Sequence, residues 1–228
     1  MKRVLARVFV WLMALSVVPA GASVVTSLPG GVVVPMTAIP CQAPDFNCFG
    51  PGPFTFGPGI KWRSTNAFGN GGSVFGYTGD VGAYKFGSNG NWTGALGPMA
   101  GLNDSTDNIG TTDMMTFTFS SQVKAVGGFL NYNPTGSTPT TIAVYDSHRN
   151  LIEAPFQLTF TTSGANNTGA FYGFQESSPS IKYFTLTDNF IGITDLTIVS
   201  SIPEPASFLL LGSGLVGMVG YRRRRLHL

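Results

Sequence analysis

Apolar and polar residues alternate along much of the chain between residues 73 and 199, a pattern typical of β-strands. Met115, Phe117 and Phe119, for example, are separated by Thr116 and Thr118, so one face of this strand can be buried while the other stays polar. Strands are expected at 73–77, 83–86, 115–119, 123–132, 140–146, 156–160, 170–175, 181–187 and 190–199. Because no stretch of this region sustains a period of 3.6 residues, the pattern predicts an all-β fold, a single antiparallel β-sandwich that is jelly-roll-like.

The region before these strands, residues 23–72, is rich in glycine and proline and is expected to be dominated by loops. It contains a near repeat, Phe49-Gly50-Pro51-Gly52 and Phe56-Gly57-Pro58-Gly59, which predicts two turns between short strands. We expect residues 23–202 to form one secreted domain, since this length suits a single hydrophobic core.

The first 22 residues break the alternating pattern and have the organisation of a secretory signal peptide. Lys2, Arg3 and Arg7 supply a basic start, residues 8–18 are apolar, and Ala20 and Ala22 are the small residues expected at a signal peptidase site. An uncleaved N-terminal anchor is the alternative. Both interpretations predict a helix within residues 1–22 and export of the domain that follows.

The last segment, residues 203–228, breaks the pattern again with three consecutive units. Pro203 and Pro205 hold Glu204 extended, because proline fixes φ and stops a helix from running through it. Residues 206–221 carry no charge and as a helix would be about 24 Å long, short for a hydrocarbon core of about 30 Å. Within them Ser213 and Gly217 have the spacing of small residues that pack against another helix. A basic stop-transfer block follows and is expected to stay cytoplasmic: Arg222, Arg223, Arg224 and Arg225.

This ordered set closely resembles the PEP-CTERM signal of bacteria that make exopolysaccharide, which combines a Pro-Glu-Pro, a short apolar helix and an arginine-rich end. Residues 203–205, 206–221 and 222–225 match the three parts in turn. The resemblance implies recognition by an exosortase, a membrane transpeptidase-like cysteine enzyme, with cleavage near the motif. An ordinary C-terminal transmembrane anchor is the alternative. The segment 116–199 also loosely resembles the globular region of many PEP-CTERM proteins, which implies a fold rather than an activity.

Charge is distributed unevenly along the chain. The whole sequence has 13 basic and 11 acidic residues, a net charge of +2. Seven of the basic residues lie in the two end segments and one acidic residue, Glu204, lies in the tail, so residues 23–202 carry six basic and ten acidic residues, a net charge of −4. This balance removes the electrostatic support for a nucleic-acid partner.

Cys41 and Cys48 are the only cysteines, and six residues lie between them. In an oxidising compartment this pair predicts a small-loop disulfide. Metal binding would need further ligands, and only His148 and His227 are available as histidines. Redox catalysis usually uses two intervening residues rather than six. We therefore predict a structural disulfide, no metal and no cofactor.

Two groups of side chains in the domain were considered as catalytic centres. His148 lies in Asp146-Ser147-His148-Arg149-Asn150, which has the composition of a solvated turn and lacks the context of a Ser-His-Asp triad. Glu153 and Glu176 are the only glutamates of residues 23–202, and neither lies in a glycosidase motif. The sequence therefore predicts that the protein is not an enzyme.

Oxygen-rich and aromatic residues offer weaker candidates for binding. Asp104, Asp107 and Asp113 could hold Ca²⁺, but their spacing does not fit an EF-hand and such residues also form Asx turns. Trp62, Trp92, Tyr77 and Tyr84 could form a sugar-binding surface, with core packing as the simpler interpretation. Asn91, Asn103 and Asn166 match the N-glycosylation pattern, which chance explains in a chain this rich in Asn, Ser and Thr.

The expected protein is thus an exported, non-enzymatic surface or exopolysaccharide-matrix protein with a structural or interaction role. Its expected processing partners are signal peptidase and an exosortase. The precursor would sit in the inner membrane through its C-terminal helix, with the domain in the periplasm, and reach the cell surface after cleavage. A carbohydrate-binding module and a secreted hydrolase are the alternatives that use the same route.

Overall fold

The computed structural model describes residues 23–36, 51–66, 73–77, 98–103, 113–132, 139–160, 170–188 and 190–200. These residues form strands, turns and loops without a helix, which confirms the all-β prediction. Across these ranges no helix has the length and apolar character needed to cross a membrane. The helices predicted within residues 1–22 and 206–221 lie outside the described residues, as does the strand predicted at 83–86.

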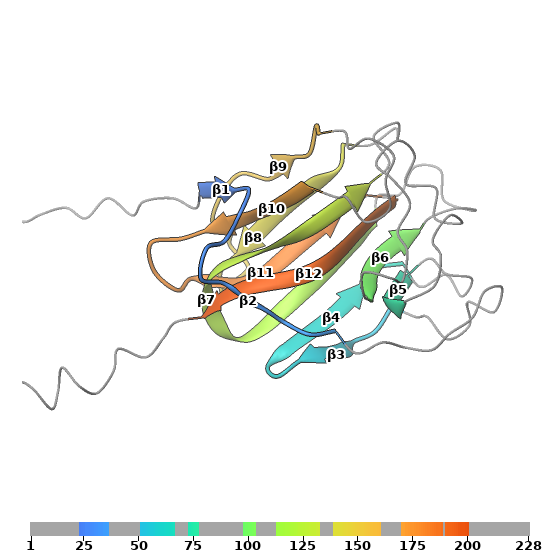
Figure 1. Cartoon of the computed structure of the whole chain (residues 1–228), viewed down its shortest axis with the longest axis horizontal. Coiled ribbons are helices and arrows are strands. Elements are labelled where there is room, and N and C mark those ends of the chain that lie inside the picture. The colour runs from blue at the N-terminus through green and yellow to red at the C-terminus, as the bar shows by residue number, and fades with distance from the viewer. Residues whose placement is uncertain are drawn as a thin grey trace, which may run out of the picture.

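Twelve strands make up the described structure (Figure 1). They are β1 (Ser23–Val25), β2 (Val32–Val33), β3 (Phe54–Gly57), β4 (Ile60–Ser64), β5 (Ser73–Tyr77), β6 (Met99–Asn103), β7 (Met114–Tyr132), β8 (Thr141–Tyr145), β9 (Phe156–Gln157), β10 (Ala170–Gln175), β11 (Ile181–Thr187) and β12 (Phe190–Ser200). All the pairings between them are antiparallel.

The two layers expected of a sandwich are joined into one hydrogen-bonded sheet by β7, and the sheet is nearly barrel-like. The first half of β7 pairs with β4 on one side and β11 on the other. Its second half pairs with β10 and β12. We call the strands that pair with the first half of β7 the first arm, which continues through β8 and β9. We call the strands that pair with its second half the second arm, which continues through β6 and β5. The strands predicted separately at 115–119 and 123–132 are therefore one strand.

A bulge in β7 lets one strand serve both arms. Met115, Phe117 and Phe119 point into the core in the first half, whereas Val126 and Leu130 do so in the second. The pairing of Val199 with Ala125 but of Ser200 with Val123 leaves Lys124 as an extra residue. Because side chains alternate with a period of two, one extra residue moves the buried face from odd to even positions.

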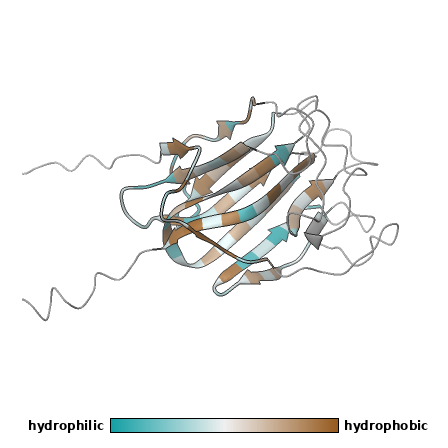
Figure 2. Cartoon of the chain, viewed as in Figure 1, coloured by the Kyte–Doolittle hydropathy of each residue, from teal (hydrophilic) through white to brown (hydrophobic). Residues whose placement is uncertain are grey.

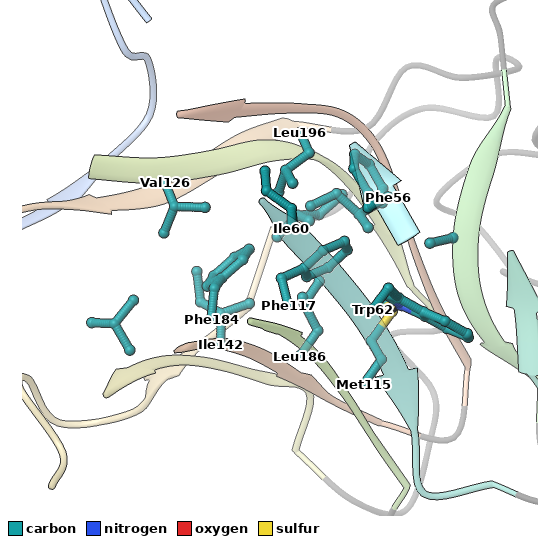
Figure 3. Packing of buried hydrophobic residues seen from close by; sticks show 14 of the residues in the cluster. Phe56, Ile60, Trp62, Met115, Phe117, Val126, Ile142, Phe184, Leu186 and Leu196 are labelled. Carbon is teal, nitrogen blue, oxygen red and sulfur yellow. Dashed lines mark hydrogen bonds between the residues drawn. The ribbon is translucent and has the colours of Figure 1, made fainter. Parts of the chain in front are cut away.

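The core is a single cluster that draws on both arms, and Phe117 lies near its centre (Figure 3). The Phe117 ring meets Phe56 edge-on at a centroid distance of 5.3 Å and stacks on Phe184 at 6.1 Å. Trp62 is fully buried and its Nε1–H points to Met115 Sδ at 3.4 Å. Burial of each such side chain stabilises the fold by roughly 1.5–3 kcal/mol.

An aromatic ladder closes the edge where β9 of the first arm approaches β10 of the second. Phe156 and Phe160 both stack on Tyr172, with centroid distances of 5.6 and 5.0 Å. Tyr132 meets Phe160 edge-on and donates a hydrogen bond from its hydroxyl to the Phe160 carbonyl oxygen at 2.6 Å. These rings replace backbone pairing across the gap, which explains why the sheet is nearly closed.

The glycine- and proline-rich region is more ordered than a loop-dominated reading implies, because 23–36 and 51–66 contain four short strands. β3 and β4 form a hairpin whose turn, Pro58-Gly59, falls where a turn was predicted; Gly59 has φ of +74°, a conformation that favours glycine. The segment after β2 runs across to this hairpin (Figure 1): the Val34 N–H donates to the Leu196 carbonyl at 2.8 Å, and Val34 packs beside Gly57. Hydropathy drawn on the strands alternates along their length (Figure 2), as the sequence pattern predicted.

Candidate functional site

The chain enters and leaves the domain at the same end, where β7 bends at Ser120–Gln122. The register places Ser23 beside Gln175, Gln175 beside Ala125, and Ala125 beside Val199. Three strand spacings of about 4.8 Å put the start of β1 roughly 14 Å from the end of β12. Both lie on the left of Figure 1. We call this region the bend end.

The sorting motif itself lies outside the described residues, immediately beyond Ser200. The same holds for the other predicted processing and tail residues: Ala20, Ala22, Pro203, Glu204, Pro205, Ser213, Gly217, Arg222, Arg223, Arg224 and Arg225. Cys41 and Cys48 also lie outside the described residues, so the disulfide stays a prediction. What the structure supplies is the surface from which the tail departs.

Two adjoining hollows mark the bend end, one of about 350 Å³ and one of about 370 Å³. Both are bordered by Gly59, Ile60, Phe119 and Ser120. The first hollow also has Lys61 and Lys182 on its walls, and its lining is otherwise largely apolar. The second extends to Ile198 and Ser200, at the point where the chain leaves the domain.

Hydrogen bonds hold the bend end together. The Lys182 ammonium donates to the Ser120 carbonyl at 2.7 Å, and the Gln122 side-chain amide donates to the Ser180 carbonyl at 3.2 Å. The Glu176 N–H donates to the carbonyl of Lys124 at 2.8 Å. Carbonyl groups freed by the bend are thereby satisfied, so the surface is fixed by contacts from both arms.

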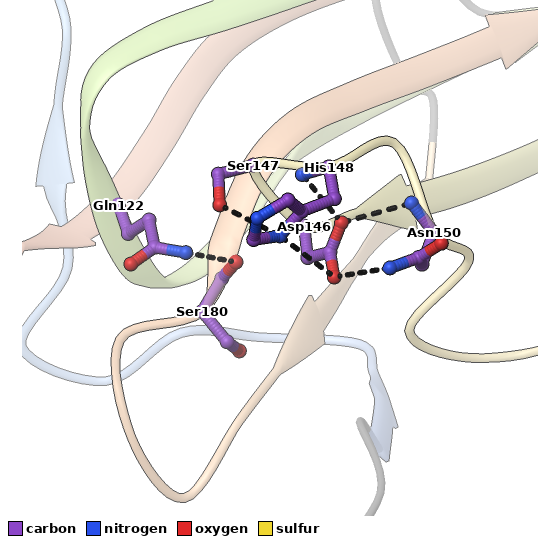
Figure 4. A network of polar contacts seen from close by, with 6 residues as sticks. All are labelled: Gln122, Asp146, Ser147, His148, Asn150 and Ser180. Carbon is purple, nitrogen blue, oxygen red and sulfur yellow. Dashed lines mark hydrogen bonds and ion pairs between the residues drawn. The ribbon is translucent and has the colours of Figure 1, made fainter.

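The predicted turn at residues 146–150 also lies at this end, next to the start of β11 (Figure 4). Asp146 accepts hydrogen bonds at 2.8 Å from the N–H groups of His148 and Asn150, and its other oxygen accepts from the Asn150 amide at 3.0 Å. Partial burial raises the pKa of Asp146, but these hydrogen bonds outweigh it and lower that pKa below its ordinary value. His148 is 82% exposed. Its Nδ1 lies 3.4 Å from Ser147 Oγ and 4.0 Å from Asp146 Oδ2, so the same ring nitrogen faces both neighbours. The structure thus confirms the predicted solvated turn.

Glu176 and Glu153 are brought near each other by the fold, at the end of β10 and in the β8–β9 connection. Glu176 is 7% exposed, and its Oε1 has no hydrogen-bond partner in the described structure. Burial raises the pKa of Glu176, and the charge of Glu153 raises it further. Two carboxyls with one of raised pKa are also found in acid–base pairs.

Asp113 is used by the structure as a loop clamp. Its two carboxylate oxygens accept hydrogen bonds from Thr65 Oγ1 at 3.1 Å and Asn66 Nδ2 at 2.6 Å. The other two weak calcium candidates, Asp104 and Asp107, lie outside the described residues. Within the described ranges no three acidic, histidine or cysteine side chains come together as a possible metal site.

Of the aromatic residues that are candidates for sugar binding, only Trp62 has a described side chain. Trp62 is buried in the core, the side chain of Tyr77 is not among those described, and Tyr84 and Trp92 lie outside the described residues. Asn91 and Asn166 lie outside them as well, and Asn103 is described only in its backbone, in β6.

Sequence reasoning missed a different aromatic pair, on the outer face of the second arm. Phe129 is 39% exposed and meets Phe171 of β10 edge-on at 5.5 Å. Gly127 leaves room for the Phe171 ring, since a side chain there would clash with it. Asn131 lies two residues further along the same face, fully buried, with neither amide atom hydrogen-bonded in the described structure. Only the β7–β10 register reveals this grouping.

Comparison with known protein families bears on the tail. Residues 201–225 match the PEP-CTERM protein-sorting motif, which confirms the resemblance drawn from Pro203 to Arg225. The motif marks a chain that is exported and processed by an exosortase for the surface or extracellular matrix. A search among curated proteins found no match.

Comparison with solved structures found only distant similarities. A fucose-binding module from Streptococcus pneumoniae has 9% identity and a TM-score of 0.31, over 47% of this chain and 73% of that one. The lectin domain of lectinolysin complexed with Lewis b antigen has 9% identity and a TM-score of 0.30, over 45% and 72%. A family 32 CBM from C. perfringens NanJ, in complex with galactose, has 11% identity and a TM-score of 0.34, over 62% and 93%. Similarity at this level assigns neither a fold nor a ligand to this chain.

Proposed function

We propose that the protein is a non-enzymatic component of the cell surface or exopolysaccharide matrix, held in the inner membrane by its tail until an exosortase releases it. The observation that carries this proposal is the motif match at residues 201–225. Support comes from the fold, because β12 delivers the chain directly from a packed domain to the motif at the bend end. Residues 201 and 202 are the only ones between them.

The two ends of the tail have separable tasks. A carboxylate between two prolines at the outer edge of a membrane helix is solvated, so anchoring does not need Glu204. The arginines at the other end set topology and retention through their charge. Loss of Glu204 therefore affects recognition, whereas loss of the arginines affects insertion.

We predict that Glu204→Ala leaves the protein in the inner membrane but abolishes processing, so that the uncut form accumulates. Replacing Arg222 to Arg225 by serine should reduce membrane retention as well. The measurement is the apparent mass and the membrane fraction of each variant, in a host with and without its exosortase. Equal processing of wild type and Glu204→Ala, or processing that persists without the exosortase, would leave only a plain membrane anchor.

A second candidate function, binding of exopolysaccharide, is favoured by the outer face of the second arm. Phe129, which is 39% exposed and lies edge-on to the half-buried Phe171, offers an apolar platform to the C–H face of a sugar ring.

We expect Phe129→Ser to reduce retention of the protein on immobilised exopolysaccharide from a producing strain by about fivefold, since aromatic stacking is worth about 1 kcal/mol. The matched control is Leu151→Ser, which also replaces an exposed apolar residue, 43% exposed, but on the first arm's side. Equal retention of the Phe129→Ser and Leu151→Ser variants would rule out this face as the binding site.

A further inference from the structure

The bend end must lie close to the membrane while the tail is inserted. Five residues, 201–205, separate Ser200 from the apolar segment that begins at Ala206. A fully extended chain spans at most about 3.6 Å per residue, so Ser200 stays within roughly 20 Å of the point where the helix enters the bilayer. The start of β1 is at the same end, which brings that surface as a whole toward the lipid.

Basic side chains are concentrated at this end, although residues 23–202 as a whole are acidic. Of the five basic residues in the described ranges, all but Arg63 lie close to it: Lys61, Lys124, Arg149 and Lys182. Arg149 lies over the ring of Tyr183 at 4.5 Å, which holds its guanidinium at the start of β11.

The carboxylates of the described structure offset part of this charge but leave the two lysines of the first hollow unpaired with an acid. Asp113 and Asp188 lie at the opposite end, where the N–H of Asp188 donates to the Asp113 carbonyl, and Asp195 lies in the middle of β12. At the bend end Asp146 keeps its charge and is hydrogen-bonded within its own turn, and Glu176 is buried with Glu153 as its acidic neighbour. In the described structure neither Lys61 nor Lys182 has a carboxylate within ion-pair distance.

The first hollow gives these charges a shape that fits an amphiphile. Its lining is mostly apolar and includes Phe119 and Ile60, and Lys61 and Lys182 supply the ammonium groups. The Lys182 ammonium is positioned by its hydrogen bond to the Ser120 carbonyl. Two ammonium groups beside an apolar surface suit a phosphate joined to glycerol and acyl chains better than a fully polar anion.

We propose that the bend end is a docking surface for anionic phospholipid head groups, which lie between Lys61 and Lys182 while the tail holds the precursor in the membrane. The inference rests on the proposed function, since it needs the tail in the bilayer. Docking would hold the domain against the membrane and so restrict the orientations in which the segment after Ser200 meets a membrane enzyme.

The test uses the full chain in lipid nanodiscs and a photo-crosslinking residue, p-benzoyl-phenylalanine, at one of two exposed positions. It replaces either Ser121, which lies at the bend, or Gln157, which lies at the other end of the first arm. After illumination, mass spectrometry measures the fraction of protein that carries a lipid adduct. In discs of phosphatidylglycerol and phosphatidylethanolamine we expect adducts at position 121 at least about fivefold above those at position 157 and above those in phosphatidylcholine discs.

Charge variants distinguish binding of the lipid head group by the two lysines from simple closeness of position 121 to the bilayer. Lys61→Glu combined with Lys182→Glu should reduce the adduct at position 121 to the phosphatidylcholine level, whereas Arg63→Glu, on the same strand as Lys61, should leave it unchanged. Lys61→Glu alone keeps the Lys182–Ser120 hydrogen bond and should give an intermediate loss, which guards against a folding defect. Equal adducts at positions 121 and 157, or no dependence on lipid charge, overturns the inference alone. A chain that fails to stay in the discs overturns the inference and the membrane-held precursor together.

Discussion

At the scale of single residues, Glu176 is unusually buried for a glutamate. A glutamate is normally exposed, yet Glu176 is 7% exposed with one oxygen unpartnered in the described structure. Side chains alternate between the two faces of a strand, so the Gln175 side chain points outward and that of Glu176 points inward. Burial and the nearby charge of Glu153 both raise its pKa, so folding favours the protonated form.

The sign of the resulting pH dependence follows from that shift. A carboxyl whose pKa is higher in the folded state stabilises the fold below its unfolded pKa, ordinarily near 4.5, and this contribution is lost as the pH rises through the folded value. Glu176→Gln keeps the shape but removes the charge. We predict that it raises the free energy of unfolding at pH 7 by about 1 kcal/mol, a Tm increase of a few degrees.

Thermal unfolding of wild type and Glu176→Gln, followed by circular dichroism between pH 3.5 and pH 8, measures this effect. The difference in Tm should be largest at pH 7 and vanish below the ordinary glutamate pKa. Glu153→Gln, which removes only the neighbouring charge, should give a smaller gain with the same trend. A Glu176→Gln variant less stable than wild type at pH 7 would contradict the assignment of a buried carboxyl with an unpartnered oxygen.

At the scale of elements, several strands were predictable from the sequence. The predictions at 170–175 and 181–187 have the same bounds as β10 and β11, and that at 190–199 falls one residue short of β12. In each of these strands the apolar residues can be buried on one face, and this pattern can be read from the sequence of the strand itself. By contrast, the strand predicted at 156–160 is reduced to Phe156–Gln157. The Leu158 N–H still donates to the Thr140 carbonyl at 2.9 Å, and Phe160 contributes its ring to the ladder.

The continuity of β7 could not be read from the sequence. Ser120, Ser121 and Gln122 have the composition of a turn, and only partners far away in the chain keep this stretch extended. The same is true of the bulge in β12, where Asp195 has φ of +49° and Leu196 turns into the core. Bulges change which face is buried, so register-dependent features such as Phe129 beside Phe171 were missed. The sorting motif, a linear signal, was found from sequence alone.

At the scale of the whole molecule, the two ends that processing would remove leave from one surface. This arrangement lets the domain fold as a unit with both termini directed the same way. A separate feature of the sequence is that these two end segments carry a charge opposite to that of the domain. The basic residues of the signal segment and of the tail surround an acidic centre, and each cleavage changes the net charge by a fixed amount.

The charge changes give the last prediction. The intact chain has a net charge of +2 and an isoelectric point near 8.6. Removal of residues 1–22 takes away three basic residues and leaves −1, and removal of residues 203–228 takes away four arginines and Glu204 and leaves −4. Isoelectric focusing combined with intact mass measurement should therefore resolve three species in order, basic, near neutral and acidic. In Glu204→Ala the series should stop at a near-neutral species with a net charge of 0, because the second cleavage is blocked. An acidic end product from Glu204→Ala, or a wild-type protein that stays near neutral in a host with its exosortase, would show that the tail is not released at this motif.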